Sequence, residues 1–323
     1  MEHSNAPCQH PAPRIAVVVP CYNEERALPL SMPRLLEVLD RLVAQDSITA
    51  DSYVMCVDDG SSDKTWQTIN QLNASDSRVH GITLTHNRGH QYALLAGLMT
   101  VAPECDAAVS IDADMQDDPN AIAQMVEKYR AGAEIVYGVR ASRVTDTWFK
   151  RNSARAFYRL QESMGLQTVF DHADYRLMSR RALEILGEYK EQNLFLRGII
   201  PMIGLDTAIV YYNRAERIAG ESKYPLRKML AFSVDGITGF TSKPLRWIFF
   251  IGMMLLVVDL LVAVYVLIAF FTGSTVSGWS SLMLSVWFLG SLLLMAIGVV
   301  GEYIGKIFIE VKSRPRYTIK SRL

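Results

Sequence analysis

Short apolar runs alternate with helical patterns and polar turns through the first part of the chain. Five runs have the length and β-branched content of strands, and they lie at 15–20, 53–57, 81–85, 107–111 and 134–138. Leucines at helical spacing follow the first run, and a helix is predicted at about 89–101, after the third. Strands that alternate with helices or polar loops predict an α/β domain whose mostly parallel sheet is covered on both faces.

Two longer apolar segments occupy the last part of the chain, at 247–271 and 282–304. Each exceeds the roughly 20 residues that a helix needs to cross a bilayer. The link at 272–281 carries no charge, whereas basic residues flank the outer ends of both segments: Lys223, Arg227, Lys228, Lys243, Arg246, Lys306, Lys312, Arg314, Arg316, Lys320 and Arg322. The positive-inside rule therefore predicts a multi-pass membrane protein with both termini in the cytoplasm. Two buried core helices of a soluble protein are the alternative.

These patterns divide the chain into six parts. They are a disordered N-terminus at 1–13, a cytoplasmic α/β domain at 14–222, an amphipathic juxtamembrane region at 223–246, transmembrane helices at 247–271 and 282–304, and a basic cytoplasmic tail at 305–323. The first part is polar and lacks the apolar core of a signal peptide. The helical spacing in the juxtamembrane region predicts a helix in the headgroup layer, and a core-facing helix of the α/β domain is the alternative.

Composition narrows the range of functions. The 323 residues are 50% apolar and carry a formal net charge of zero, so bulk electrostatics gives no support to a nucleic-acid partner. The four cysteines lie far apart without a C-x-x-C pair, which argues against a zinc site and against a disulfide framework.

The most informative polar feature is a pair of carboxylates, Asp112 and Asp114, directly after the fourth strand. On an extended backbone the two side chains lie on the same side, where their charges repel unless a hard divalent cation sits between them. A solvated turn is the alternative for an isolated pair. The chain has neither a G-x-G-x-x-G step nor a P-loop, so phosphate must be neutralised in another way. A Mg²⁺ or Mn²⁺ ion held by Asp112, Asp114 and Gln116 is therefore predicted.

Other polar side chains follow the neighbouring strands, namely Asn23, Glu24, Asp58, Asp59, Asn87 and Arg140. Ligands of open α/β sheets bind beyond the carboxyl ends of the strands. The sequence therefore predicts one site at this edge.

Six ordered motifs give these residues a family context. They are Pro-Cys-Tyr-Asn-Glu-Glu at 20–25, Val-Asp-Asp-Gly-Ser-Ser-Asp at 57–63, Asn-Arg-Gly-His at 87–90, Asp-Ala-Asp-Met-Gln-Asp at 112–117, Asp-Tyr-Arg-Leu-Met at 174–178 and Gly-Glu-Ser-Lys-Tyr at 220–224. In this order the chain resembles family 2 glycosyltransferases of the polyprenyl-phosphate type. It is similar to bactoprenol glucosyltransferases and, more distantly, to dolichol-phosphate mannose synthase. The resemblance implies a GT-A-like domain in a protein of the bacterial cytoplasmic (inner) membrane.

The resemblance also implies roles for individual residues. The base and ribose of the donor are expected at Pro20, Tyr22, Glu24 and Asp59, and the metal and diphosphate at Asp112, Ala113, Asp114 and Gln116. Arg140 and Lys223 are expected near the phosphates, and Asp174 is the candidate catalytic base. The chain departs from the family at His90, where lysine is common, and at Val139, where serine is common.

Structural alternatives exist for several of these residues. Tyr22 could pack a turn, Asp58 could form a turn or cap a helix, Lys223 could face the headgroups, and Asp174 could be an ion-pair partner of Arg176. Asp259 lies in the middle of the first predicted span, where a polar contact with another membrane helix is favoured over a role in chemistry.

The expected reaction is an inverting transfer of a hexose, with glucose as the best match, from a UDP-sugar to undecaprenyl (polyprenyl) phosphate at the cytoplasmic membrane face. The product would supply lipid-linked sugar for cell-envelope glycan modification. Another sugar (N-acetylglucosamine, galactose, mannose from GDP-mannose or a modified pentose), a processive polysaccharide synthase and a non-enzymatic sugar-nucleotide sensor are the alternatives. Because a phosphate acceptor is largely ionised at neutral pH, Asp174 could position it rather than remove a proton. Resemblance further implies a homo-oligomer, in the form of a tetramer.

Overall fold

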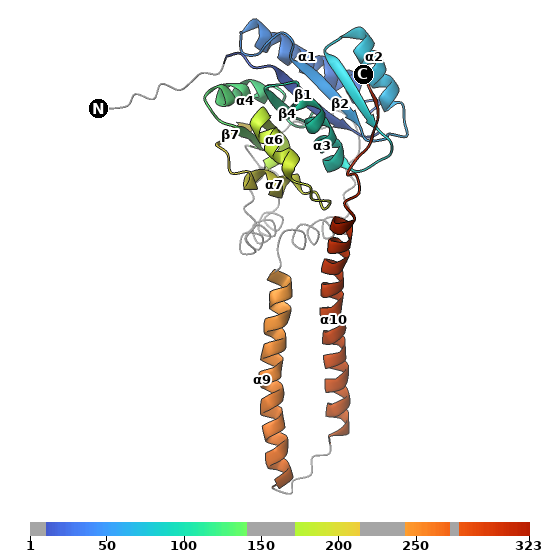
Figure 1. Ribbon diagram of the computed structural model, residues 1–323, viewed down its shortest axis with the longest axis vertical. Helices are drawn as coiled ribbons and strands as arrows, with labels where there is room; N and C mark the ends of the chain where they lie inside the picture. The colour runs from blue at the N-terminus through green and yellow to red at the C-terminus, as the bar shows by residue number, and fades with distance from the viewer. Residues whose placement is uncertain (1–10, 141–171, 214–242, 272–277) are drawn as a thin grey trace, which may run out of the picture. The chain divides into compact units, whose positions relative to one another are not determined.

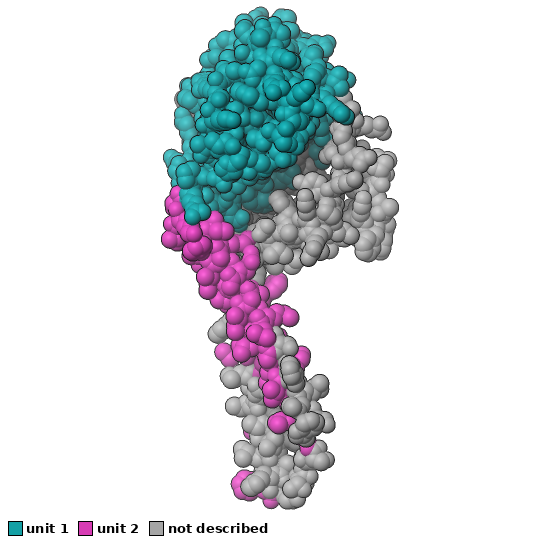
Figure 2. All heavy atoms as spheres, turned by 90° about the vertical axis from the view of Figure 1, so that its right-hand side faces the viewer, with its two compact units in different colours: residues 1–162, 167–223, 314–323 teal, residues 163–166, 224–313 magenta. Residues whose placement is uncertain are grey.

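The computed structural model describes residues 11–140, 172–213, 243–271 and 278–323 (Figure 1). The chain divides into two compact units, shown in different colours in Figure 2. Unit 1 comprises 1–162, 167–223 and 314–323, and unit 2 comprises 163–166 and 224–313.

The described part of unit 1 is built on one eight-stranded sheet in the order β7-β5-β6-β4-β1-β2-β3-β8. The strands are β1 (Ile15–Cys21), β2 (Tyr53–Asp58), β3 (Val79–Leu84), β4 (Ala107–Ser110), β5 (Ile135–Arg140), β6 (His172–Ser179), β7 (Thr207–Tyr212) and β8 (Ile319–Arg322). Strand β6 pairs antiparallel with β4 and β5, and β8 pairs antiparallel with β3, whereas the other pairs are parallel. The predicted mostly parallel sheet and its first five strands are confirmed.

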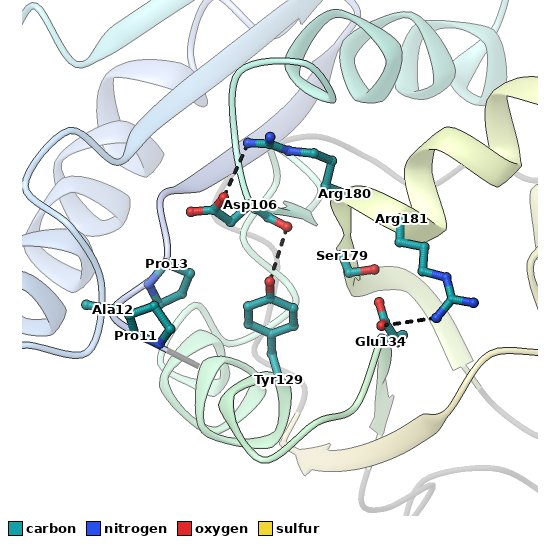
Figure 3. Close-up of a pocket in the computed structure, with 9 residues that line it drawn as sticks. All are labelled: Pro11, Ala12, Pro13, Asp106, Tyr129, Glu134, Ser179, Arg180 and Arg181. Atoms are coloured by element: carbon teal, nitrogen blue, oxygen red, sulfur yellow. Dashed lines mark hydrogen bonds and ion pairs between the residues drawn. The ribbon is translucent and has the colours of Figure 1, made fainter. Parts of the chain in front are cut away.

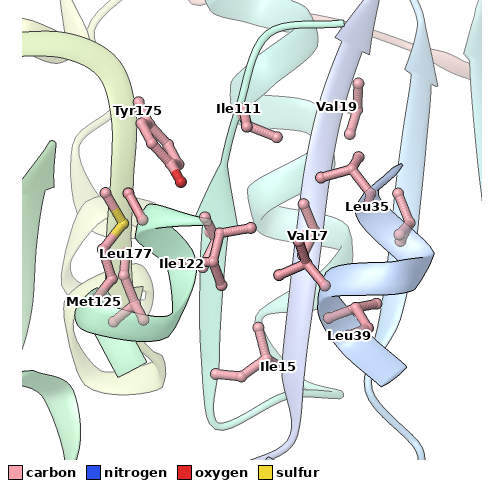
Figure 4. Packing of buried hydrophobic residues seen from close by; sticks show 14 of the residues in the cluster. Ile15, Val17, Val19, Leu35, Leu39, Ile111, Ile122, Met125, Tyr175 and Leu177 are labelled. Carbon is pink, nitrogen blue, oxygen red and sulfur yellow. The ribbon is translucent and has the colours of Figure 1, made fainter. Parts of the chain in front are cut away.

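Helices cover both faces of this sheet, as predicted. The helices of unit 1 are α1 (Leu28–Ala44), α2 (Thr65–Ser75), α3 (His90–Val101), α4 (Ala121–Arg130), α6 (Arg180–Glu188) and α7 (Leu196–Met202). Alternate residues of a strand point to opposite faces of the sheet. Ile15, Val17 and Val19 of β1 therefore pack against the helices on one face, and Val18 packs against the helices on the other. Figure 4 shows the first three residues packed with Leu35 and Leu39 of α1.

The opposite face of β1 packs against α3. Gly97 of this helix lies so close to the sheet that a Cβ atom there would stand 2.4 Å from Val18 Cγ1 and 2.6 Å from Val57 Cγ2. The helix therefore lies directly on β1 and β2, and its N-terminus at His90 lies just past the end of β3.

Unit 2 contains two long helices, α9 (Lys243–Phe271) and α10 (Trp279–Lys312). Within the described residues, one helical segment, 288–312, is long and apolar enough to cross a membrane. Its apolar side chains are exposed, for example Leu294 and Val311. Helix α9 covers the other predicted span, and the passage of both helices through a bilayer stays a prediction.

The tail of the chain forms part of the sheet, which the sequence did not indicate. Strand β8 pairs with the outer edge of β3, and Leu323 N donates a hydrogen bond to Gly81 O at 2.8 Å. Arg322 also forms an ion pair with Glu104, with 2.5 Å between Nη2 and Oε1. An edge strand with free backbone groups invites pairing with other chains, so β8 covers an exposed edge.

Candidate active site

The order of the strands marks where a ligand would bind. Strand β1 lies between β4 and β2, so the connections on its two sides run in opposite directions. In an open α/β sheet, the crevice beyond the carboxyl ends of the strands at such a switch point is the usual ligand site. The loop that holds the two predicted metal carboxylates follows β4 at this point.

Burial alternates along this loop. Ala113 and Met115 are 4% and 2% exposed, whereas Asp112, Asp114 and Gln116 are only partly buried. Met115 has a positive φ of 52°, which makes a sharp turn, and Gln116 N donates to Asp114 Oδ1 at 3.2 Å. The three oxygen-bearing side chains are therefore accessible, and buried apolar neighbours anchor the loop. Ala113 itself can offer a ligand only its backbone.

Negative charge accumulates around Asp112. Burial raises the pKa of its carboxyl group to about 6, and the nearby Asp174, Asp117 and Asp114 add to the shift while His90 opposes it. A divalent cation would relieve this repulsion. No three His, Cys, Asp or Glu side chains among the described residues are arranged to hold a metal by themselves. Two carboxylates and one amide still fit Mg²⁺ or Mn²⁺, because substrate phosphates and water commonly complete such a shell.

The turn after β1 is tied to the turn before α2. Asn23 N donates to Ser61 Oγ at 2.9 Å, and Asn23 Oδ1 accepts from Ser62 N at 3.0 Å. Glu24 N donates to Thr65 Oγ1 at 2.8 Å. These bonds hold two of the predicted nucleotide-binding motifs against each other.

The predicted base and ribose ligands differ in accessibility. Tyr22 is 48% exposed and Glu24 is partly buried, so both can meet a ligand. Pro20 is buried within β1. The carboxylate of Asp59 is also buried and accepts from Arg88 N at 2.7 Å and Gly89 N at 2.8 Å. Asp59 therefore holds the loop before α3 in this structure.

Asp58 has a structural set of contacts. Its carboxylate accepts from Ser61 N at 3.1 Å and from Thr83 Oγ1 at 2.6 Å, and its side chain is buried. The turn-forming alternative for Asp58 agrees with these bonds. Gly60, two residues further along the chain, has a φ of 62°, and a Cβ atom there would lie 2.6 Å from His86 C, so only glycine fits this close approach.

Arg140 ends β5 and contacts a buried carboxylate that the sequence did not single out. Its Nη2 lies 3.1 Å from Asp117 Oδ1, which also accepts a 2.5 Å hydrogen bond from Tyr212 Oη. Asp117 is 1% exposed. The Arg140 side chain is 31% exposed, so it can still reach a phosphate. Asp117 is the last residue of the motif at 112–117, which is the one sequence signal that pointed to it.

Asp174 lies on β6 at the centre of a cluster of basic side chains. Arg176 Nη2 donates to its Oδ1 at 2.5 Å, and Arg197 donates to both carboxylate oxygens at 3.2 and 3.1 Å. His90 Nε2 is 3.6 Å from Asp174 Oδ2 and 3.7 Å from Asp112 Oδ1. The ion pair of Asp174 with Arg176 is thus present, and His90 joins this cluster to the predicted metal ligand. No motif indicated Arg197, which comes from α7.

Opposing effects act on the titration of these groups. Burial favours the neutral form of Asp174, but the contact with His90 and the charges of Arg197 and Arg176 hold its pKa well below the usual range. Loss of water around His90 disfavours its charged form, yet contacts with Asp174 and Asp112 raise the pKa of the ring. A carboxylate with such a low pKa is a weak base.

A separate hollow of about 330 Å³ lies at the opposite ends of the strands from the Asp112 loop (Figure 3). Its lining includes Asp106 and Glu134, which precede β4 and β5, and Ser179, which ends the antiparallel β6. Arg180 pairs with Asp106 at 3.2 Å, and Arg181 pairs with Glu134 at 3.9 Å. This hollow therefore lies at the amino ends of the parallel strands, away from the Asp112 loop.

Lys223 and the motif at 220–224 lie outside the described residues, as do most of the juxtamembrane region and of the predicted disordered N-terminus. Among the described residues, the structure brings the predicted Asp112 and Asp174 together with His90, which belongs to the 87–90 motif, and with Arg197, which no motif indicated. Arg140 stands at the end of the same sheet with Asp117 and Tyr212.

Comparisons with known proteins agree with this arrangement. The model of glycosyl transferase family 2 matches residues 16–187. The glycosyltransferase YkoT of Bacillus subtilis (strain 168) is 49% identical over 307 residues, which cover 95% of this chain and 91% of YkoT. A bactoprenol glucosyl transferase of Shigella phage SfX is 38% identical over 311 residues, which cover 96% of this chain and 99% of that protein.

Among solved structures, the mannosyltransferase PcManGT from Pyrobaculum calidifontis, in complex with GDP-Man and Mn²⁺, is 19% identical with a TM-score of 0.45 and covers 94% of this chain and 87% of that one. The mostly parallel mixed sheet of unit 1 is a GT-A-like α/β fold. Because the family model matches residues 16–187 and these relatives align with nearly the whole chain, the chain belongs to glycosyl transferase family 2 and is a glycosyltransferase.

Proposed function

We propose that this protein transfers a hexose, glucose in the first instance, from a UDP-sugar to undecaprenyl or another polyprenyl phosphate. The proposal rests on one observation: the accessible carboxylates Asp112 and Asp114, beyond the carboxyl end of β4, lie next to the basic cluster around Asp174. Carboxylates suit a metal-bound diphosphate, and basic groups suit a phosphate acceptor. The name of the Shigella phage relative, a bactoprenol glucosyl transferase, supports this acceptor.

The donor would bind on the side of the Asp112 loop. Asp112, Asp114 and Gln116 would hold Mg²⁺ or Mn²⁺, which neutralises the charge that develops on the leaving diphosphate. Arg140 would donate to the same phosphates from the end of β5, and Lys223 is proposed to do so from the 220–224 motif. Tyr22, Glu24, Pro20 and Asp59 are proposed around the base and ribose.

The acceptor supplies its own nucleophile. A phosphate monoester has a second pKa near about 6, so its oxygen is largely ionised at neutral pH and needs no strong base. This oxygen attacks the anomeric carbon, the bond from that carbon to the diphosphate oxygen breaks, and UDP leaves. A single displacement inverts the anomeric centre and gives a β-linked lipid-phosphate sugar from an α-linked donor.

The membrane part would bring the lipid acceptor to the enzyme. We propose that 247–271 and 282–304 span the cytoplasmic membrane, with 14–222 and 305–323 in the cytoplasm and 223–246 at the lipid surface. Cysteine labelling tests this topology, because a reagent that stays outside the cell should reach a cysteine placed at 272–281. Labelling only after lysis would contradict it. Assembly as a homo-oligomer stays a prediction.

The decisive assay uses the purified full chain with undecaprenyl phosphate and a panel of labelled UDP- and GDP-sugars. We expect one UDP-sugar to yield a product soluble in organic solvent, with one sugar per lipid and with activity that EDTA abolishes. A polymer would favour a processive synthase, and binding of the donor without turnover would favour a sensor. Transfer that continues in EDTA would refute the metal site.

A matched pair of variants localises the metal effect. Asp112→Asn removes one charge from the predicted metal site, whereas Asp106→Asn removes one carboxylate charge at the amino ends of the parallel strands. We expect Asp112→Asn alone to abolish the stimulation by metal.

A further inference from the structure

The basic cluster holds a residue with no assigned role in transfer. We propose that Arg197, oriented by Asp174, binds the anionic phosphate of the acceptor. The inference rests on the proposed function, because that function supplies a phosphate monoester as the second substrate. It concerns a residue that lies outside every motif read from the sequence.

Basic side chains gather around Asp174. Three basic side chains, Arg176, Arg197 and His90, contact the single carboxylate of Asp174. His90 also approaches Asp112, but that carboxylate is a predicted metal ligand. Arginine and histidine side chains that lie next to a metal-diphosphate site are groups that commonly bind a phosphate anion.

Arg197 and His90 are the accessible members of this cluster. The side chains of Arg197 and His90 are 39% and 42% exposed, whereas those of Asp174 and Arg176 are 11% and 1% exposed. A ligand that enters this cluster therefore meets the guanidinium of Arg197 and the ring of His90 before the carboxylate. A buried base between them would be poorly placed to accept a proton from a lipid headgroup.

Arg197 has a fixed orientation. Its Nε and Nη2 donate to the two oxygens of Asp174, which is the two-pronged geometry that holds a guanidinium in one plane. Asp174 is itself fixed by Arg176, whose Nε and Nη1 are buried and have no hydrogen-bond partner among the described residues. Arg176 stands on β6 opposite Ser110 of β4 and Tyr137 of β5, so the sheet determines its position. Asp174 is thus a positioning residue for Arg197.

The cluster around Asp174 lies close to the predicted donor site. His90 lies within 3.7 Å of Asp112 and within 3.6 Å of Asp174, so one side chain separates the predicted metal ligand from the carboxylate that holds Arg197. The attacking phosphate oxygen must come within about 3–3.5 Å of the anomeric carbon. An anion held by Arg197 would lie on the side of the donor where this approach is needed.

The test separates the two substrates in steady-state kinetics of the full chain. Arg197→Gln removes the positive charge, and Arg197→Lys keeps the charge but loses the planar guanidinium group. Arg181→Gln is the control, because Arg181 is an exposed arginine at the amino ends of the parallel strands. We expect Arg197→Gln to raise the KM for undecaprenyl phosphate about 10- to 100-fold and to leave the donor KM unchanged, since a charge-assisted contact is lost. Arg197→Lys should recover part of the loss. An increase in the donor KM instead would place Arg197 on the nucleotide sugar and overturn the inference.

The role of Asp174 is tested by the pH profile of Asp174→Asn. A positioning residue predicts an elevated acceptor KM at every pH from about 6 to about 8, because the orientation of Arg197 is lost throughout. A proton-removing residue predicts a loss confined to the acid side, where the acceptor is a monoanion. This second profile would contradict positioning by Asp174.

Binding without turnover distinguishes failure of this inference from failure of the proposed function. Decyl phosphate, a short alkyl phosphate, should raise the Tm of the wild-type chain and of Arg181→Gln but not that of Arg197→Gln. If no sugar is transferred to lipid while this dependence on Arg197 holds, the proposed function fails and the anion site stands. If transfer occurs and Arg197→Gln keeps its acceptor KM and its response to decyl phosphate, the anion site fails and the function stands.

Discussion

Tyr212 provides a direct test of the network that holds Arg140. Its hydroxyl group donates to Asp117 Oδ1 at 2.5 Å and accepts from Arg140 Nε at 3.3 Å, and the residue is 4% exposed. Tyr212→Phe removes this hydroxyl group and keeps the ring, which packs edge-on against Tyr175 with centroids 5.2 Å apart. The substitution therefore isolates the hydrogen bonds from the packing.

The expected loss can be sized from these contacts. A hydrogen bond to a charged group contributes about 1.5–3 kcal/mol, and its removal leaves the buried Asp117 with Arg140 as its remaining partner among the hydrogen bonds described above. We expect the free energy of unfolding of unit 1 to fall by about 2 kcal/mol. For a domain of this size, that corresponds to a decrease in Tm of about 4–8 °C.

The assay is thermal denaturation of the purified full chain, followed by donor kinetics. Tyr211→Phe is the matched control, because it lies next along β7 and is 63% exposed. We expect Tyr212→Phe also to raise the donor KM, since Arg140 loses its fixed orientation, while Tyr211→Phe changes neither quantity. Equal Tm values for the two variants would refute the assignment of the Asp117 network as a support for Arg140.

Three further outcomes follow from the described contacts. Gly97→Ala should destabilise unit 1 by about 1–3 kcal/mol in urea unfolding, because the new methyl group would overlap Val18; an unchanged midpoint would show that α3 can shift outward. Asp63→Asn should cost about 1 kcal/mol at neutral pH, because Asp63 accepts from Thr65 N at 2.9 Å. Burial raises the pKa of Asp63, but hydrogen bonds with Thr65 outweigh this effect and lower the pKa. The difference in unfolding free energy between Asp63→Asn and wild type should therefore vanish as pH falls through this lowered pKa, and a difference that stays constant would exclude the charge of Asp63 as its cause. Mn²⁺ affinity in calorimetry should fall as pH decreases through about 6, where Asp112 takes up a proton, and a flat profile from pH 5 to 8 would exclude Asp112 as a ligand.

Local patterns predicted much of this protein. The first five strands and the helix at 90–101 appear where the apolar periodicity placed them, because burial on a sheet or helix imposes a repeat that is visible in one segment. The alternation of accessible and buried residues from Asp112 to Gln116 has the same origin. The antiparallel β6 was missed as a strand, although its motif at 174–178 was noted, because the direction and partner of a strand are not encoded in its own periodicity.

The candidate site likewise has some features that are visible in the sequence and others that depend on the tertiary structure. The amino-acid sequence by itself determined the carboxylate pair, the absence of a glycine-rich phosphate loop, the family resemblance and the two long apolar segments, because each is a property of neighbouring residues. Tertiary structure decided that Asp117 and Tyr212 support Arg140, that β8 covers the edge of β3, and that Arg197 and His90 surround Asp174. These contacts join residues far apart in the chain, and only the pairing of strands and the packing of α3 and α7 against them bring such side chains within a few ångströms.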